Sequence, residues 1–306
     1  MAARLSGDGL CWRMGPFIVR LRTNLPELTE TLRLLYGDFP VEADGFADFH
    51  VRLSAAGVRR WWRPKVQFFV DERPPFEPLP RTSAVPLLEW GLNWCVSTRA
   101  DQYLIVHAAV VERHGRAIVL PGPPGAGKST LCAGLLLRGW RLLSDEFALV
   151  RPDDGRLVPL PRPVSLKEES ISTVRQLAPD VLMGPSSRDT WKGTVAHMRP
   201  PSGSVARAAV PADPGWVVFP AFRPEEPMRL TPHPRSRTLA RLARNSFNWN
   251  LLGARGFEAL STLVDRSGCY ELTHRDLEEA LRALEELPPP EAAPPPPGDN
   301  ASRADG

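Results

Sequence analysis

The sequence GPPGAGKS, at residues 122–129, matches the phosphate-binding pattern G-x-x-x-x-G-K-[ST]. An apolar run precedes it at residues 116–120, and an apolar, helix-like stretch follows at residues 130–137. Between a strand and a helix, such glycines let successive backbone N–H groups turn inward around phosphate oxygens. The pattern therefore predicts a nucleotide-binding loop, formed by Gly122, Gly125, Ala126, Gly127, Lys128, Ser129 and Thr130.

Two acidic residues follow this loop after one expected helix and one short expected strand. After the helix expected at residues 128–138, residues 140–144 are predicted to form a short strand that ends at Asp145 and Glu146. A right-handed crossover between parallel strands places both strand ends at the same edge of a sheet. We therefore expect Asp145 to face Lys128, which would reach the outer phosphates, while the Ser129 hydroxyl could bind Mg²⁺.

Composition narrows the possible classes of protein. The chain has 306 residues and a formal net charge of +3, which argues against nucleic acid as the main partner. Its four cysteines show no C-x-x-C spacing, so neither a zinc site nor a disulfide framework is indicated. No apolar stretch has the length of a signal peptide or a membrane span. We expect a soluble, cytoplasmic protein with no membrane partner.

Periodicity predicts alternating strands and helices before the loop. Strands are expected at residues 15–22 and 47–54, helices at 26–36 and 85–98, and a proline-rich connection at 74–80. The runs 103–113 and 115–122 are predicted to pair as a hairpin around His114 and Gly115.

The chain after residue 151 is less regular. We expect a turn at 152–155, an irregular approach to a helix near 170–177, and a loop at 189–201. Further on, the patterns predict strands at 216–219 and 269–273 and helices at 235–252, 256–264 and 276–286. The predicted organisation is an N-terminal α+β region at 1–100, a nucleotide-binding domain at 101–287 and a disordered Pro/Ala-rich tail at 288–306.

Only one helix and one short strand separate the glycine-rich loop from the acid pair. This compact arrangement resembles the HPr kinase/phosphorylase family, and the residues that carry it are HAAVVERHGRAIVLPGPPGAGKSTL at 107–131 and LLLRGWRLLSDE at 135–146. More closely, the chain through about Glu286 is similar to the group called HPr kinase-related kinase A. The similarity rests on FADFHVRL, LLEWGLNWC, LLSDEFAL, PRPVSLK, KGTVAHMRPP and NSFNWNLLG. It implies a mixed α/β fold whose P-loop core is related to phosphoenolpyruvate carboxykinase, and possible homo-oligomers.

The resemblance also implies roles for individual residues. Asp145 would be the general base for an acceptor hydroxyl and Glu146 would help to hold Mg²⁺, although the reverse assignment is open. His107 corresponds to a histidine near the family's active site. The chain has PRPVSLKEES where the family carries an E-I-R-G-L-G type of signature. The resemblance therefore does not extend to phosphorolysis or to recognition of HPr.

Other polar residues have a functional and a plain interpretation. Lys192, His197 and Arg199 could clamp an anion or decorate a surface loop, and the same holds for Arg162 and Lys167. His107 lies in an apolar run, where a histidine is often an interior residue. Arginines 235, 237, 241 and 244 fit a solvent face, and Trp90, Trp94 and Trp249 fit core positions better than stacking platforms.

Three hypotheses follow from the sequence. The first is an ATP- and Mg²⁺-dependent kinase that phosphorylates a hydroxyl, plausibly a protein serine, on an unidentified protein or small-molecule acceptor. The second is a nucleotide-gated binding module without phosphoryl transfer. The third is hydrolysis of ATP or GTP that drives a switch. The candidate base directly after the short strand favours transfer.

Overall fold

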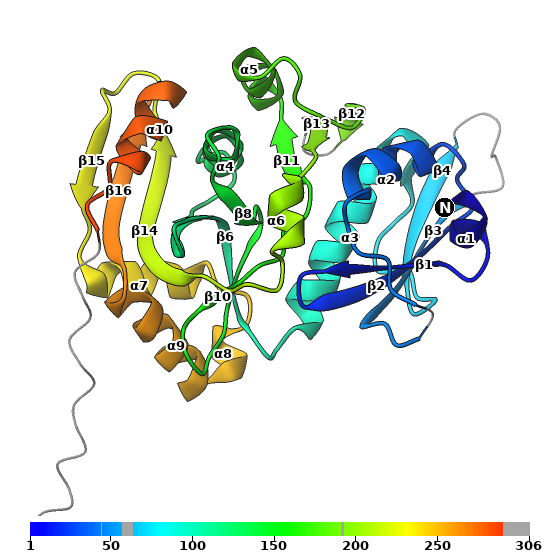
Figure 1. Ribbon diagram of the computed structural model, residues 1–306, viewed down its shortest axis with the longest axis horizontal. Coiled ribbons are helices and arrows are strands. Elements are labelled where there is room, and N and C mark those ends of the chain that lie inside the picture. Colours follow the sequence, from blue (N-terminus) through cyan, green and yellow to red (C-terminus); the bar gives the residue numbers. More distant parts are fainter. Residues whose placement is uncertain (44, 57–63, 191–192, 290–306) are drawn as a thin grey trace, which may run out of the picture.

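The computed structural model describes residues 1–43, 45–56, 64–190 and 193–289. The predicted mixed α/β class is confirmed, because a five-stranded, an eight-stranded and a three-stranded sheet are combined with helices. In Figure 1 the first sheet, coloured blue to cyan, stands at one end of the molecule, and the eight-stranded sheet stands at the other. Helix α3 lies between them (Figure 1).

The five-stranded sheet has the order β1-β2-β3-β4-β5. Its strands confirm the predictions for 15–22 and 47–54, and the two predicted helices are also present. Strands β1, β4 and the short β5 were not predicted. The elements are α1 (Ala2–Ser6), β1 (Leu10–Met14), β2 (Phe17–Thr23), α2 (Leu28–Tyr36), β3 (Phe49–Ala56), β4 (Lys65–Val70), β5 (Leu79–Pro80), η1 (Arg81–Ser83) and α3 (Ala84–Arg99).

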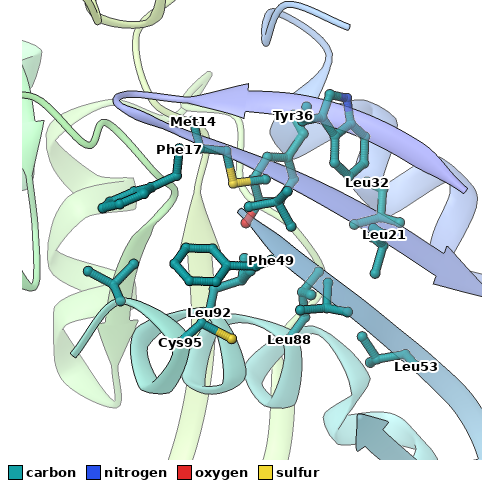
Figure 2. Close-up of a cluster of buried hydrophobic side chains, with 14 of the residues drawn as sticks. Met14, Phe17, Leu21, Leu32, Tyr36, Phe49, Leu53, Leu88, Leu92 and Cys95 are labelled. Atoms are coloured by element: carbon teal, nitrogen blue, oxygen red, sulfur yellow. The ribbon is translucent and has the colours of Figure 1, made fainter. Parts of the chain in front are cut away.

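Apolar side chains fill the space between this sheet and its helices. Figure 2 shows Leu88, Leu92 and Cys95 of α3 next to Phe49 and Leu53 of β3. All five are almost completely buried. Because side chains alternate across a strand, the residues at every second position of β2 and β3 point to this core. The first 100 residues thus have an apolar core.

The eight-stranded sheet carries the residues of the predicted site. Its order is β10-β9-β6-β7-β14-β16-β15, and β8 also pairs with β6. The helix α4 follows β7. The elements are β6 (Leu104–Arg113), β7 (Arg116–Pro121), α4 (Lys128–Leu137), β8 (Arg141–Ser144), β9 (Phe147–Val150), β10 (Leu157–Val158), β14 (Asp213–Phe222), β15 (Arg229–Pro232) and β16 (Gly268–His274).

Strand direction brings several loops to one edge of this sheet. The predicted hairpin is confirmed, since β6 and β7 are antiparallel with Arg113 opposite Arg116. Strands β7 and β8 both run antiparallel to β6, so they are parallel to each other, as the crossover argument required. Strand β14 is parallel to β7 and to β16. The residues that follow β7, β8, β14 and β16 therefore meet at the same edge.

A third sheet corrects two predictions. The stretches expected to be irregular near 159–170 and loop-like at 189–201 contain β11 (Val164–Lys167), β12 (Ser187–Thr190) and β13 (Gly193–Met198), in the order β11-β13-β12. Prolines and polar residues obscure the alternation of apolar and polar residues that marks a strand. Tertiary packing nevertheless stabilises these strands, because Val164, Leu166 and Ala196 are buried in the same apolar core as residues of α4 and α5 (Glu169–Leu177). The short helix α6 (Ser202–Ala206) follows.

The single helix predicted at 235–252 is wrong, because two helices occupy this region. Residues 245–248 leave the helical path to pair with β6: the Phe247 N–H donates to the Ile105 carbonyl at 2.9 Å, and the Asn248 Oδ1 accepts from the Ile105 N–H at 3.0 Å. The helices are α7 (Arg235–Arg244), α8 (Trp249–Leu252), α9 (Ala254–Asp265) and α10 (Leu277–Glu285). Within the described part of the chain, none of the helices combines the length and apolarity that crossing a bilayer requires.

Candidate functional site

Residues 122–130, called the glycine loop below, comprise the connection from β7 to α4 and the first turn of α4, at the edge described above. Gly125 and Gly127 have φ angles of 84° and 92°, in the left-handed region that favours glycine. A Cβ atom on Gly127 would lie 3.1 Å from the His274 Nε2 atom. The loop therefore needs glycine at position 127 for both its backbone conformation and its close approach to β16.

Lys128 is the first residue of α4 and is only 8% exposed. Its ammonium group donates to the Gly122 carbonyl at 2.7 Å and to the Pro123 carbonyl at 3.0 Å. Burial lowers the pKa of Lys128, whereas the charges of Glu146 and Asp145 raise it. The lysine is thus held across the mouth of the loop by carbonyl groups, close to two carboxylates.

Asp145 faces the glycine loop. Its Oδ2 atom accepts from the Ser129 hydroxyl at 3.1 Å and from the Ser165 N–H at 3.0 Å. The Oδ1 atom is buried and has no hydrogen-bond partner. The helix after the loop, the end of β8 and strand β11 together position this carboxylate, because each supplies one of the three residues.

The carboxylate of Asp145 is 5% exposed, and burial raises its pKa to about 7. The negative charge of Glu146 contributes to the increase, while the two hydrogen bonds and Lys128 oppose it. A carboxylate with a pKa near neutrality can exchange a proton under physiological conditions, which is a property of catalytic acids and bases.

Glu146 and His107 form the outer part of the same edge. The His107 Nε2 atom lies 3.4 Å from the Glu146 Oε2 atom, and both side chains are about one quarter exposed. His107 is in β6, opposite Phe147 of β9, where the chain resumes strand pairing after Asp145 and Glu146. The predicted residues Lys128, Ser129, Asp145, Glu146 and His107 therefore lie along one sheet edge.

A pocket next to Asp145 includes residues from the N-terminal part of the chain. Helix α3 contributes Glu89, Trp90 and Asn93, and the segment before β11 contributes Arg162. The remaining lining residues are Ser144, Asp145, Glu146, Pro163 and Ser165. Arg162 was one of the ambiguous candidates, and it borders Asp145.

Arg162 is held by a buried polar network. Its guanidinium donates to the Glu89 carboxylate at 3.2 Å and to the Asn93 side-chain oxygen, and the Tyr36 hydroxyl donates to the other oxygen of Glu89. Arg162 and Glu89 are 6% and 4% exposed. Sequence analysis did not find Glu89, Asn93 or Tyr36, because no motif marks positions that lie 53 to 73 residues from their partners.

The remaining candidates lie apart from one another. His197 is buried on β13 opposite Ser165, and Lys167, at the end of β11, is close enough to influence the pKa of Lys128. Arg199 pairs with Asp38 of the N-terminal part at 2.6 Å. Lys192 lies outside the described residues. The hydroxyl of Thr130, in the first turn of α4, is hydrogen-bonded to that of Ser170 at 2.7 Å.

Some of the tryptophans and arginines occupy the expected core or surface positions, and others do not. Trp94 and Trp249 pack against two different hydrophobic cores, as expected, whereas Trp90 lines the pocket at Asp145. Three of the four arginines on α7 are exposed, but Arg241 pairs with Glu271 and lies over the Phe219 ring, 3.8 Å from its centroid.

Comparison with known proteins gives one partial similarity. The model of the SynChlorMet cassette protein ScmC matches residues 87–165. This range extends from α3 to Ser165, so it includes the glycine loop, Asp145 and all the lining residues of the pocket. None of the curated proteins matches the chain. The name ScmC carries no activity, and the similarity is confined to the segment that builds the candidate site.

Proposed function

We propose that this chain is an ATP- and Mg²⁺-dependent kinase related to HPr kinase, which transfers the γ-phosphoryl group to a hydroxyl, with a protein serine as the expected acceptor. The observation that carries this proposal is the convergence of Lys128, Ser129 and Asp145 at one sheet edge. In this proposal the glycine loop is the phosphate-binding loop of a P-loop core within residues 101–287.

The loop suits a triphosphate chemically. The backbone N–H groups of Gly125 and of residues 127–130 are available as donors at the N-terminus of α4. The Ala126 N–H already donates to the Pro123 carbonyl at 3.3 Å, and Pro123 and Pro124 have no N–H. The Lys128 ammonium is now satisfied by two carbonyl groups, which are weaker partners for a cation than phosphate oxygens. An incoming phosphate would compensate the burial that lowers the pKa of Lys128.

The residues beside the loop also fit Mg²⁺. This ion prefers oxygen ligands and is usually held by one or two carboxylates together with phosphate oxygens. With Asp145 as the base, the Ser129 hydroxyl and the Glu146 carboxylate would hold the ion. Glu146 directly follows Asp145, whose Oδ2 atom lies 3.1 Å from the Ser129 hydroxyl. When bound there, Mg²⁺ would neutralise negative charge on the phosphates.

We assign the base to Asp145. Its unpartnered Oδ1 atom would accept the proton of the acceptor hydroxyl. The acceptor oxygen would form a bond to the γ-phosphorus while the bond from that phosphorus to the β,γ-bridging oxygen breaks, so that ADP leaves. The pKa of about 7 supports this role. The contact of Oδ2 with Ser129 supports the reverse assignment, with Asp145 on the metal and Glu146, beside His107, as the base.

The test is transfer of labelled γ-phosphate from ATP, with Mg²⁺, into a lysate of the source cells. Lys128→Ala should abolish labelling because the outer phosphates lose their cation, and Asp145→Asn should lower it about 10²–10⁴-fold while sparing ATP binding. Lys65→Ala, which changes an exposed lysine on β4, is the matched control and should label normally.

Two results would change the proposal. If Glu146→Gln abolishes transfer while Asp145→Asn only raises the Mg²⁺ concentration needed, the two carboxylates have the reverse roles. If the native chain binds ATP but labels nothing, the kinase is replaced by the nucleotide-gated binding module.

A further inference from the structure

The glycine loop divides its sheet edge into two unlike halves. On one side, beyond β6, lie Asp145 and Glu146. On the other side, the ends of β14 and β16 bring Phe222 and His274 together, since these two residues are direct partners in the parallel pairing of the strands. One half is acidic and the other is aromatic.

Phe222 is the last residue of β14, and its side chain is exposed. Its relative exposure is 41%, whereas Phe219, three residues earlier in the same strand, is 2% exposed. A Cβ atom built on Gly127 would lie 3.9 Å from the Phe222 Cβ atom. The edge of the glycine loop thus borders a solvent-accessible aromatic ring.

His274 packs beside both the loop and this ring. Its ring centroid is 5.6 Å from that of Phe222, and the two rings are inclined at 59°. The residue is 3% exposed, and burial lowers its pKa, so the imidazole is neutral at pH 7. The Asp276 backbone opposes this decrease in pKa, and the Nε2 atom lies 3.1 Å from the position that a Gly127 Cβ atom would occupy. The imidazole therefore packs as an uncharged ring against Phe222 and the glycine loop.

The direction of a bound nucleotide follows from the two halves. If the γ-phosphate lies next to Lys128 and Asp145, the acidic half of the edge is occupied by the phosphoryl group and its acceptor. The nucleoside must then leave the loop on the opposite side, where β14 and β16 end. Nucleobases stack favourably on exposed aromatic rings, and this stacking does not require hydrogen bonds that read the base.

Resting on the nucleotide-dependent function proposed above, we propose that Phe222, supported by His274, is the stacking platform for the purine base of the nucleotide. This assignment gives the aromatic half of the edge a ligand of defined chemistry. It also predicts that the platform contributes to binding of the nucleoside but not to binding of the phosphates.

The experiment compares the affinities of the full-length protein for ATP and for inorganic tripolyphosphate. Phe222→Ala should weaken ATP binding by about tenfold and leave tripolyphosphate binding unchanged, because only ATP carries a base. Phe222→Tyr should bind ATP as the native chain does. Phe257→Ala, which changes an exposed phenylalanine of α9 with 51% exposure, is the matched control and should alter neither affinity.

The possible failures are distinguishable. If both ligands bind in a Lys128-dependent manner and Phe222→Ala weakens neither, the platform is wrong while the nucleotide function stands. If Phe222→Ala weakens both ligands equally, Phe222 shapes the loop and does not hold a base, which also overturns the platform. If neither ligand binds the native chain, or if binding survives Lys128→Ala, the proposed function fails and the platform fails with it.

Discussion

The N-terminal sheet and the edge of the eight-stranded sheet bury different kinds of side chain. The first encloses apolar groups such as Trp12, Leu53 and Phe68, whereas the second encloses Lys128 and Asp145, which are 8% and 5% exposed. Apolar burial stabilises a fold, but burial of a titratable group costs free energy unless it is paired. The eight-stranded sheet also has apolar cores, so its buried reactive groups are confined to the edge at the glycine loop.

A buried polar pair lies at the boundary between these regions, where Ile105, Phe147 and Leu149 also pack against the N-terminal core. Glu89 of α3 and Arg162, which belongs to the segment before β11, form a buried ion pair beside Asp145. The N-terminal part therefore supplies a charged group to the pocket even though its own core is apolar. The following predictions test how far the two regions differ, beginning with the largest expected change.

Phe68→Ala should lower the free energy of unfolding by about 3–5 kcal/mol, because it removes a fully buried ring from the N-terminal core. Chemical denaturation measures the change. Phe69→Ala, on the opposite face of β4 and partly exposed, is the control and should cost about 1 kcal/mol or less. Equal losses in the two variants would show that this core does not carry the stability we assign to it.

Glu89→Ala should destabilise the fold by about 3 kcal/mol, because it leaves the Arg162 guanidinium buried without its carboxylate. Combining Glu89→Leu with Arg162→Met should recover most of this loss, since both buried charges are then absent. Thermal unfolding compares the three proteins. If Glu89→Ala alone does not change the stability, the ion pair is solvated and does not stabilise the boundary.

Asp145→Asn should stabilise the protein by about 1–2 kcal/mol at pH 8, in contrast to the first two substitutions. Removing the carboxylate with the raised pKa gains about 4 kcal/mol, and a buried amide N–H without an acceptor offsets about 2–3 kcal/mol of that gain. The pKa of Asp145 is about 7 in the folded state and near 3.8 in the unfolded state. The native carboxyl group therefore destabilises the fold increasingly as pH rises from about 4 to about 7. The advantage of the variant should therefore grow between about pH 4 and pH 7 and stay constant above that range.

Denaturant titrations at several pH values measure this difference. Asp180→Asn, at an exposed aspartate, is the matched control and should show no such pH dependence. A stability difference that is independent of pH for Asp145→Asn would contradict the raised pKa and remove one support for the base.

The sequence predicted those parts of the site that depend on local spacing. The hairpin before the loop, helix α4 and the parallel direction of β7 and β8 follow from one motif and one rule of chain handedness, and all three are confirmed. Sheet β11-β13-β12 was missed because its short strands lack clear alternation. Glu89 and His274 were missed because strand order and helix packing, which no local pattern encodes, bring them to the edge.

The wall that α3 forms around Asp145 has a consequence for the outcome of the proposed reaction. Water competes with any acceptor hydroxyl for the phosphoryl group. A base that is open to solvent would activate water, and ATP would be hydrolysed. Trp90 and the Glu89 to Arg162 pair stand on one side of that base. Under the proposed function, the first hundred residues would therefore set the ratio of useful transfer to wasteful hydrolysis without touching the nucleotide.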